Sequence, residues 1–346
     1  MRNTKIALAV LALVASTAAM ADGATVYGSL DASMAKTTDG RMSFDGSGNW
    51  GGSYFGISGS EDLDGGMKAS YALEGGLNIG TGAQDNGGTS GAAGAAVGAV
   101  FNRQGNVGLS GDFGSVKAGL QLSPYIGAVA NGIAGGNSFF VPLLIMSSNR
   151  SADGASVTGT GATANGGFFI PNSVSYTTPS IGGFTGSVLS QVSAGVDADK
   201  YTAYSGNFAQ GDVSVAAAYQ SRTNEYSSTA ATAGYQMGQL RLSAGYIKHS
   251  DTGTTTDTNT YTVGAAYAVT EKATVNANYA RNNATNAAGI TNLSAYYSLS
   301  KNTGLYATYS RGTNGAGTLY STRGDGLGGA STASQTGYAV GIRKMF

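Results

Sequence analysis

Segments of about ten residues in which polar and apolar side chains alternate recur along most of this chain. One of them has the sequence Thr274, Val275, Asn276, Ala277, Asn278 and Tyr279. A period of two places successive side chains on opposite faces of a β-strand. After residue 21, no apolar run reaches the roughly 18 residues that a membrane-spanning helix needs. The sequence therefore predicts an all-β chain whose strands each have an apolar and a polar face.

The number and spacing of these segments narrow the architecture. The expected strands are Thr25–Lys36, Asn49–Gly59, Gly65–Ile79, Phe101–Ser110, Ser115–Ser123, Asn172–Pro179, Gly183–Ser193, Lys200–Phe208, Asp212–Arg222, Ser228–Met237, Gln239–His249, Asn259–Val269, Lys272–Asn282, Ile290–Leu299, Asn302–Arg311 and Gln335–Phe346. Every second connection between them is short, which is typical of an outer-membrane barrel. Sixteen strands leave an aqueous channel, whereas side chains fill an eight-stranded barrel. We therefore expect a 16-stranded antiparallel transmembrane β-barrel.

Composition agrees with a barrel that meets lipid through alternate residues. Charged residues make up 11% of the chain, against about a quarter in soluble proteins, and there are 20 tyrosines. A soluble β-sandwich or a surface-layer protein is the alternative, and it would need its apolar faces packed against each other. A net charge of +0 argues against a nucleic-acid partner. The sequence holds no cysteine, so disulfides do not contribute to the fold.

The first residues are typical of a secretory signal peptide. Arg2 and Lys5 precede the apolar run Ile6–Ala15, and Ala19-Met20-Ala21 matches an A-x-A cleavage site. We therefore expect residues 1–21 to be removed on export and residues 22–346 to form the barrel.

One long stretch, Pro124–Ile170, interrupts the series of strands. It shows no sustained alternation, although it contains many apolar residues. A loop of this length inside a compact domain is uncommon unless it has a function. We expect it to fold into the lumen of the barrel and to set the width of a pore.

Several motifs, in the same order along the chain, resemble the trimeric general porins of Gram-negative bacteria. They are Val26-Tyr27-Gly28, Ser58–Lys68, Phe101–Gln104 followed by Val107–Gly111, Asn172–Phe184, and the closing Tyr338–Phe346. The resemblance implies a homotrimer in the outer membrane that lets small hydrophilic solutes and ions diffuse passively. It also implies a third loop inside each barrel, and contact with outer-membrane lipid and lipopolysaccharide. Tyr338, Val340, Ile342 and the terminal Phe346 fit the signal read by the barrel-assembly machinery.

The same resemblance implies a ladder of basic residues on the pore wall, and most of it is missing. Ser29, Tyr54 and Leu120 occupy positions that are often basic in the family, and Phe169 lies where an arginine commonly ends the long loop. Only Arg103 matches a wall arginine.

The charge of the constriction is therefore expected to be small. In the long stretch, Asp153 is the only acid and Arg150 the only base. We predict a near-neutral constriction that favours uncharged or amphipathic solutes. Two alternatives stay open. Alternation groups Arg103 with Val107 and Leu109, which suits a rim or trimer contact, and other bases such as Arg241 and Lys117 would restore the field.

Function is predicted to be passive diffusion rather than catalysis. The single histidine, His249, lies at a strand end, and adjacent residues there rarely supply catalytic geometry. No cofactor or metal is expected. The alternatives to a general diffusion channel are a channel that prefers neutral or amphipathic solutes and a non-conducting structural or adhesive barrel.

Overall fold

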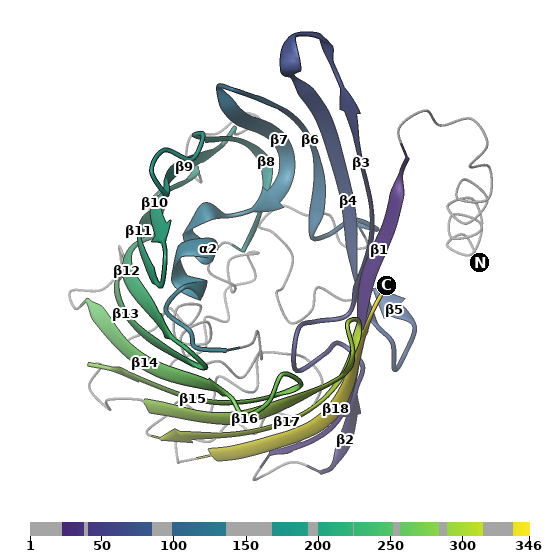
Figure 1. The fold of residues 1–346 in the computed structure, drawn as a ribbon, viewed down its shortest axis with the longest axis vertical. Helices are drawn as coiled ribbons and strands as arrows, with labels where there is room; N and C mark the ends of the chain where they lie inside the picture. The colour runs from purple at the N-terminus through teal and green to yellow at the C-terminus, as the bar shows by residue number, and fades with distance from the viewer. Residues whose placement is uncertain are drawn as a thin grey trace.

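Sixteen long antiparallel strands form one closed barrel in the computed structural model, which describes residues 23–37, 41–84, 99–135, 168–192, 200–223, 225–251, 257–283, 289–313 and 335–346 (Figure 1). The strands are β1 (Thr25–Thr37), β3 (Tyr54–Asp62), β4 (Lys68–Asn78), β6 (Gln104–Gly111), β7 (Gly114–Leu122), β8 (Phe169–Thr177), β9 (Phe184–Gln191), β10 (Tyr201–Gln210), β11 (Val213–Arg222), β12 (Tyr226–Met237), β13 (Leu240–Asp251), β14 (Thr258–Ala268), β15 (Ala273–Asn282), β16 (Gly289–Ser300), β17 (Thr303–Thr313) and β18 (Gln335–Met345). Two short strands, β2 (Ser43–Asp45) and β5 (Ala83–Gln84), pair with β1 and β4. The predicted 16-stranded antiparallel barrel is confirmed.

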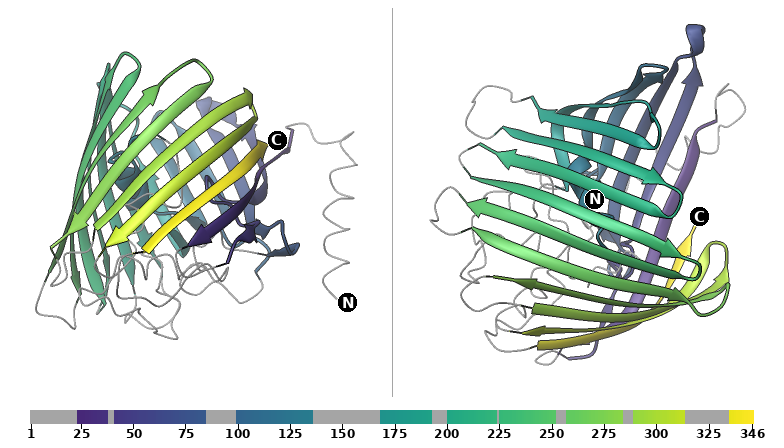
Figure 2. Two further views of the ribbon diagram at one scale, coloured as in Figure 1. Left: turned by 90° about the horizontal axis from the view of Figure 1, so that it is seen from below. Right: turned by 60° about the vertical axis from the view of Figure 1, so that its left-hand side comes forward.

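The first and last strands close the barrel. β1 pairs with β18 from Ser29 opposite Met345 to Thr37 opposite Gly337 (Figure 2). At the end of this seam, the backbones of Gly28 and Phe346 exchange hydrogen bonds of 3.0 and 3.1 Å. A Cβ atom on Gly28 would lie 2.5 Å from the Phe346 ring, so only glycine admits this approach. Closure leaves no unpaired sheet edge, which a membrane barrel requires.

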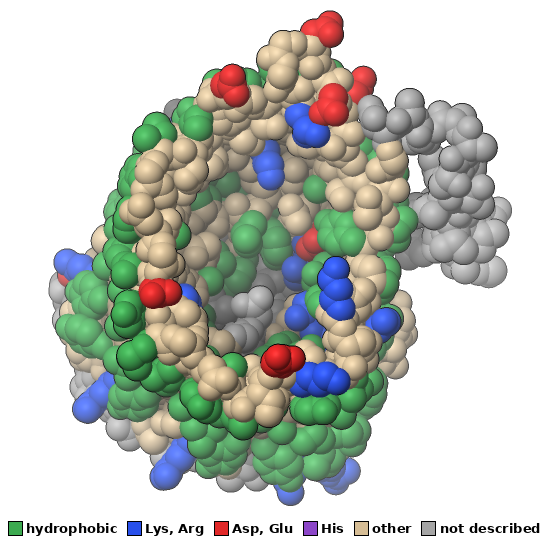
Figure 3. Space-filling view, in the orientation of Figure 1, with side chains coloured by type: hydrophobic (Ala, Val, Ile, Leu, Met, Phe, Trp, Pro, Cys, Tyr) green, Lys and Arg blue, Asp and Glu red, His purple; other side chains and the backbone are tan. Residues whose placement is uncertain are grey.

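The two faces of the wall differ in polarity. On the lumen face, Asn278, Asn292 and Thr308 are buried, whereas Leu293 and Tyr309 are exposed on the outer face. Apolar side chains cover much of the outer rim in Figure 3. Among the described residues, no helix has the length and apolar character to cross a membrane. The expected division between an apolar outer face and a polar interior is therefore present along the strands.

Short and long connections alternate around the barrel. β3 and β4, β6 and β7, β8 and β9, β10 and β11, β12 and β13, β14 and β15, and β16 and β17 are joined by short connections that the structure describes completely. Beyond residue 37, every residue outside the described ranges falls in the other set of connections. Residues 1–22, which include the expected signal peptide, also lie outside the described ranges.

Four predicted strand starts are wrong by three residues or more. β4 begins at Lys68 rather than Gly65, and β6 begins at Gln104 rather than Phe101. β3 begins at Tyr54 rather than Asn49, because residues 46–53 leave the sheet to bond with groups in the lumen. β8 begins at Phe169 rather than Asn172, because Phe169 and Ile170 pair with the end of β7. The long stretch is therefore shorter than expected at its C-terminal end.

The long stretch also begins with a helix that was not expected, α2 (Pro124–Ala130). Proline in the first turn fits a helix start, and the Ser123 Oγ caps it by accepting a hydrogen bond of 3.2 Å from the Tyr125 amide. Residues 136–167 of the stretch lie outside the described ranges.

Candidate functional site

Helix α2 lies inside the barrel against the lumen face of the wall (Figure 1). Tyr125 and Val129 are fully buried there. The apolar cluster around the helix consists of Tyr125, Ile126, Ala128, Val129, Ile133, Ile170, Leu189, Tyr201, Ala203, Ala216, Ala218, Ala230 and Ile247. Burial raises the pKa of the Tyr125 hydroxyl well above its ordinary value, so this side chain stays neutral. The helix is thus held by apolar packing on one side of the lumen.

Hydrogen bonds fix the C-terminal end of α2 to the wall. The Thr232 hydroxyl donates to the carbonyl of Ala128 at 2.7 Å. The side-chain oxygen of Asn131, the C-cap residue, accepts from Ser214 at 2.7 Å and from Arg241 at 3.3 Å. A cation at a helix C-terminus opposes the partial negative charge of the last carbonyls. The lumen-facing guanidinium of Arg241 therefore binds the C-terminal end of α2.

The residues on either side of α2 are anchored as well. The Asn278 side chain bonds to both the amide and the carbonyl of Ala134 at 3.2 Å. Before the helix, the Ser123 hydroxyl lies 2.7 Å from the Tyr201 hydroxyl, and the Ser123 amide donates to the Phe168 carbonyl at 2.8 Å. The described ends of the long stretch therefore meet at one point of the wall, and residues 124–135 run from there across the lumen face to β15.

A second projection lies on the opposite side of the lumen. We name residues 46–53, between β2 and β3, the inner segment. It carries Trp50, which is 6% exposed and packs against two tyrosines of the lumen face. The ring centroid of Trp50 lies 5.0 Å from that of Tyr296 and 5.4 Å from that of Tyr306. The inner segment thus rests on β16 and β17 from inside.

Asp31 on β1 holds the inner segment in place. Its Oδ2 accepts hydrogen bonds from the amides of Trp50 at 2.8 Å and Gly51 at 2.9 Å. Its Oδ1 accepts from the Tyr306 hydroxyl at 2.5 Å. The Ser53 side chain bonds to the Asp31 backbone in both directions. A fully buried carboxylate therefore organises the backbone of the inner segment.

Three residues expected at the pore come together around Arg103. Its Nε donates to the Glu74 carboxylate at 2.5 Å. Its guanidinium carbon lies 4.7 Å from the centre of the Tyr54 ring and 5.0 Å from that of Phe169. Glu74 also accepts from the Tyr27 hydroxyl at 3.0 Å. Because Tyr27, Tyr54 and Glu74 share the lumen face, the Arg103 side chain lies inside the barrel, although alternation grouped it with outward residues.

Ser29, predicted to replace a basic wall residue, has an arginine beside it. The Arg343 Nε donates to the Ser29 hydroxyl at 2.9 Å, and Arg343 faces Asp31 across the β1–β18 seam. Sequence reasoning missed this residue because it assigned the last strand to assembly alone. The alternation in β18 would have found it, since Arg343 has the opposite phase to outward Val340 and Ile342.

The remaining expected pore residues are Leu120, Arg150 and Asp153, and Lys117 belongs to the alternative in which other bases restore the field. Leu120 pairs with Gly105 on the outer face, so its placement does not fit a pore lining. The error has a local cause, because the position was transferred from a family motif without regard to its phase in β7. Lys117 has the opposite phase to Leu120 in β7, and its exposed side chain lies on the lumen face. Arg150 and Asp153 lie outside the described residues.

The residues expected to guide barrel assembly all face outward. Tyr338, Val340, Ile342 and Phe346 are between 43% and 55% exposed on the outer face of the last strand. This is the face that a partner could reach before the seam closes. The four side chains lie together on this face, and their recognition by the barrel-assembly machinery stays a prediction.

Charge is distributed asymmetrically over the described lumen face. Four cations on it make no exposed ion pair with a neighbouring acid: Arg103, Lys117, Arg241 and Arg343. Two more, Lys68 and Arg222, pair with Asp62 and Glu225 near the ends of their strands. Three carboxylates on the same face, Asp31, Asp45 and Glu74, are buried, and the exposed Asp62 at the end of β3 is paired with Lys68. In Figure 3, basic side chains gather inside the opening on the side of β1 and β18. A solute in the bore therefore meets the cations more directly than the acids.

Comparison with known sequences assigns this barrel to a protein family. Residues 7–317 match the Gram-negative porin family. The chain belongs to the Gram-negative porins. Outer membrane porin protein 32 of Delftia acidovorans is 30% identical to it over 375 residues that cover both chains completely.

Solved structures agree with this assignment. The anion-selective porin from Comamonas acidovorans is 26% identical, with a TM-score of 0.75 over 94% of this chain and 100% of the other. A trimer form of OmpT from Vibrio cholerae shares the fold, with 14% identity and a TM-score of 0.67 over 94% of this chain and 100% of the other. This porin is therefore an outer-membrane channel for the passive diffusion of solutes and ions, and not an enzyme.

Proposed function

We propose that the channel narrows between the α2 side and the inner segment, and that it conducts anions somewhat better than cations. The carrying observation is the asymmetry of the lumen charges. Arg103, Lys117, Arg241 and Arg343 reach the lumen, whereas Asp31, Asp45 and Glu74 on that face are buried and the exposed Asp62 is paired with Lys68. A low-dielectric wall focuses the field of such charges into the bore, which raises the local concentration of the opposite ion.

The preference is expected to be weak. Glu74 neutralises Arg103 at contact distance, and Arg241 faces the carbonyl end of α2. Only part of the positive charge is therefore available to a passing ion. Similarity to a porin described as anion-selective supports the sign of the preference. This proposal keeps the small net charge expected from the sequence but gives it a direction.

The long stretch is proposed to form one side of the constriction. Its described part supports this role, because residues 124–135 cross the lumen face and the Ser123 amide bonds to the Phe168 carbonyl. The inner segment would form the other side. The apolar surface of α2 favours, as a second candidate, a channel that prefers neutral or amphipathic solutes.

Planar-bilayer recording of the refolded protein tests the proposal. In a KCl gradient, the reversal potential should show a small excess of chloride permeability. A cation-preferring channel would contradict the proposed sign, and a closed lumen would favour a structural barrel. Liposome swelling with neutral sugars and with amphipathic solutes of the same size distinguishes general diffusion from the second candidate, which predicts faster entry of the amphipathic solutes.

We further propose a homotrimer whose last strand is read by the barrel-assembly machinery. The trimer form of OmpT, which has the same fold, supports the first part. The outward row of Tyr338, Val340, Ile342 and Phe346 supports the second. Native mass measurement in detergent tests the trimer. Replacing Phe346 with alanine should lower the amount of folded porin in the outer membrane, and an unchanged amount would contradict the assembly role.

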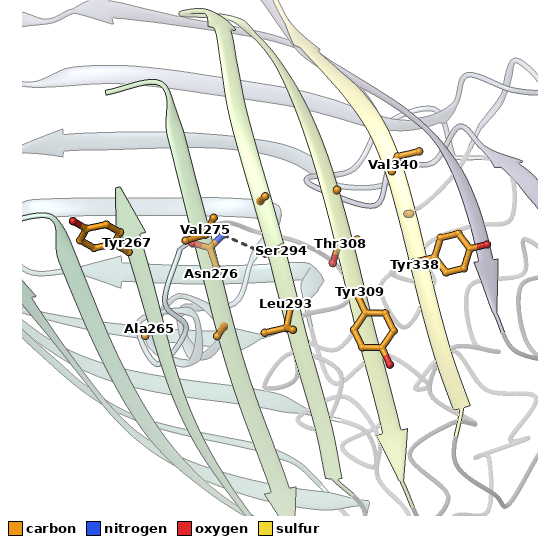
Figure 4. Close-up of a pocket in the computed structure, with 14 residues that line it drawn as sticks. Ala265, Tyr267, Val275, Asn276, Leu293, Ser294, Thr308, Tyr309, Tyr338 and Val340 are labelled. Carbon is orange, nitrogen blue, oxygen red and sulfur yellow. Dashed lines mark hydrogen bonds between the residues drawn. The ribbon is translucent and has the colours of Figure 1, made fainter. Parts of the chain in front are cut away.

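Lipid contact is proposed on the outer wall of β14 to β18. An apolar groove of about 670 Å³ lies there, lined by residues that include Tyr267, Leu293, Tyr309 and Tyr338 (Figure 4). An acyl chain of lipopolysaccharide or of another membrane lipid fits such a surface. A spin label on a lipid acyl chain should interact with a second spin label attached at position 293. If no interaction between the two labels is detected, this lipid contact is wrong.

A further inference from the structure

Two lumen arginines each lie beside a buried carboxylate, and they are bonded differently. Arg103 donates directly to Glu74 at 2.5 Å, and its side chain is 14% exposed. Arg343 faces Asp31 across the β1–β18 seam but donates its Nε to the neutral hydroxyl of Ser29. Among the described residues, Arg343 has no acidic partner within the 4.0 Å of an ion pair. The Asp31 carboxylate therefore opposes the charge of Arg343 only through space, whereas Glu74 contacts Arg103 directly.

Neutral donors occupy the carboxylate that would otherwise pair with Arg343. Both amide bonds from the inner segment, those of Trp50 and Gly51, end on the Asp31 Oδ2. The Tyr306 hydroxyl takes the Oδ1. A carboxylate with both oxygens bonded and no exposed surface has little capacity left for a guanidinium. The inner segment thus covers Asp31 on the lumen side.

Gly51 also seats the arginine. A Cβ atom at this position would lie 2.8 Å from the Arg343 guanidinium carbon and 3.1 Å from its Nε and Nη2. The guanidinium therefore lies directly against the backbone of the inner segment, beside the same residue whose amide bonds to Asp31. Only a residue without a side chain allows this contact.

We infer that Arg343 is the principal determinant of the anion preference, and that the inner segment keeps its charge available by engaging Asp31. This inference rests on the proposed anion preference. It assigns the preference to an arginine of the last strand, and it makes the inner segment a positioning element rather than only an obstruction. Arg103, whose position matches the family, contributes less because Glu74 opposes it at contact distance.

Charge-removing substitutions in planar bilayers test the inference. Arg343→Gln should lower the ratio of chloride to potassium permeability about two- to fivefold at low salt, because a unit charge a few ångströms from an ion is worth about 1 kcal/mol in water. Arg103→Gln should change the ratio less than Arg343→Gln does. Arg343→Lys, which retains the charge, should keep most of the preference for chloride. This variant controls for the effect of substitution at position 343 itself.

The possible outcomes separate the two proposals. A wild-type channel without anion preference overturns the proposed function and this inference together. A wild-type preference that survives in Arg343→Gln, or that falls equally in Arg103→Gln, overturns only the inference. The migration of the heat-modifiable folded band on a gel shows that each variant forms the barrel.

A second variant tests the seat without changing any charge. Gly51→Ala should displace the guanidinium and lower the permeability ratio, by less than Arg343→Gln does. Gly105→Ala is the matched control, because its added Cβ meets nothing nearer than 3.9 Å and lies on the outer face. A Gly51→Ala channel with the wild-type ratio would overturn the seating role of the inner segment.

Discussion

The two projections into the lumen are held in different ways. Residues 124–135, with α2, are held by an apolar cluster and by hydrogen bonds that reach from β10 to β15, of which only those from Arg241 are charged. In the inner segment, the carboxylate of Asp31 accepts from two adjacent backbone amides and Trp50 stacks on two tyrosines. The two ends of the segment bond to the end of β4, and Asn49 bonds to Ser33. Many weak contacts tolerate the loss of any one of them. In the inner segment two backbone amides share one carboxylate, so the loss of that group removes both bonds at once, and the two sides of the lumen should respond differently to mutation.

The nature of the donors explains why Asp31 matters so much. The amides of Trp50 and Gly51 belong to the backbone and cannot turn towards water without moving the whole segment. Glu74 offers a contrast within the same wall, because it accepts from the side chains of Tyr27, Arg103 and Gln104. Side-chain donors can rotate to solvent when their acceptor is lost. Leaving a buried donor without a partner costs about 1–3 kcal/mol.

The largest effect is expected for Asp31→Ala. It removes the acceptor of two backbone amides and of the Tyr306 hydroxyl, so the free energy of unfolding should fall by about 3–5 kcal/mol. The inner segment should detach and the single-channel conductance should rise. Trp50 is the only tryptophan, so its fluorescence reports on the segment directly. Its emission should shift to longer wavelength, and quenching by acrylamide should increase.

Glu74→Ala is the matched control for this prediction. It removes a buried carboxylate of the same wall, but its donors can turn to the lumen, so the loss should be smaller than for Asp31→Ala. Trp50 emission should stay as in the wild type. Equal losses, or a shift of the emission in Glu74→Ala, would show that the backbone donors have no special role.

Sequence periodicity predicted the barrel because closure and polarity impose a pattern on every strand. The strand count, the antiparallel order and the alternation of short and long connections all follow from local sequence patterns. The start of β3 was not predictable in this way. Residues 46–53 leave the sheet because of Asp31, which lies on another strand, and no local pattern shows a bond to it.

The site was predicted less well than the fold for the same reason. Arg103, Tyr54 and Phe169 were expected at the pore, and they do meet. Ser29 and Tyr54 were expected to leave gaps in the positive charge, yet Arg343 of β18 lies beside Ser29, and Arg103, just before β6, lies beside Tyr54. A position-by-position comparison with the family considers only the residue at each wall position. It misses an arginine whose long side chain places its guanidinium beside that position from elsewhere in the wall.

A smaller effect is expected on the α2 side. Tyr125→Ala empties a fully buried site in the apolar cluster, and substitutions of this kind cost about 2–4 kcal/mol. The remaining anchors at Ser123, Asn131 and Ala134 should keep the helix near the wall. We therefore expect a lower urea midpoint and a noisier conductance, with unchanged Trp50 emission. An emission shift would show that the two projections are coupled.

The smallest effect is expected for Asn278→Ala, which removes both bonds to Ala134. Ala134 is fully buried, so water reaches its amide and carbonyl only through the space that the shortened side chain leaves, and the loss should be about 1–2 kcal/mol.

Asn292→Ala on the next strand is the matched control, because within the described residues its side chain bonds only to β17. Both variants lose a buried asparagine from the lumen face, but only Asn278→Ala frees the chain that follows α2. A change of conductance in Asn278→Ala alone would therefore show that residues 131–135 contribute to the constriction. An equal change in both would mean that the wall, and not the projection, sets the conductance on this side.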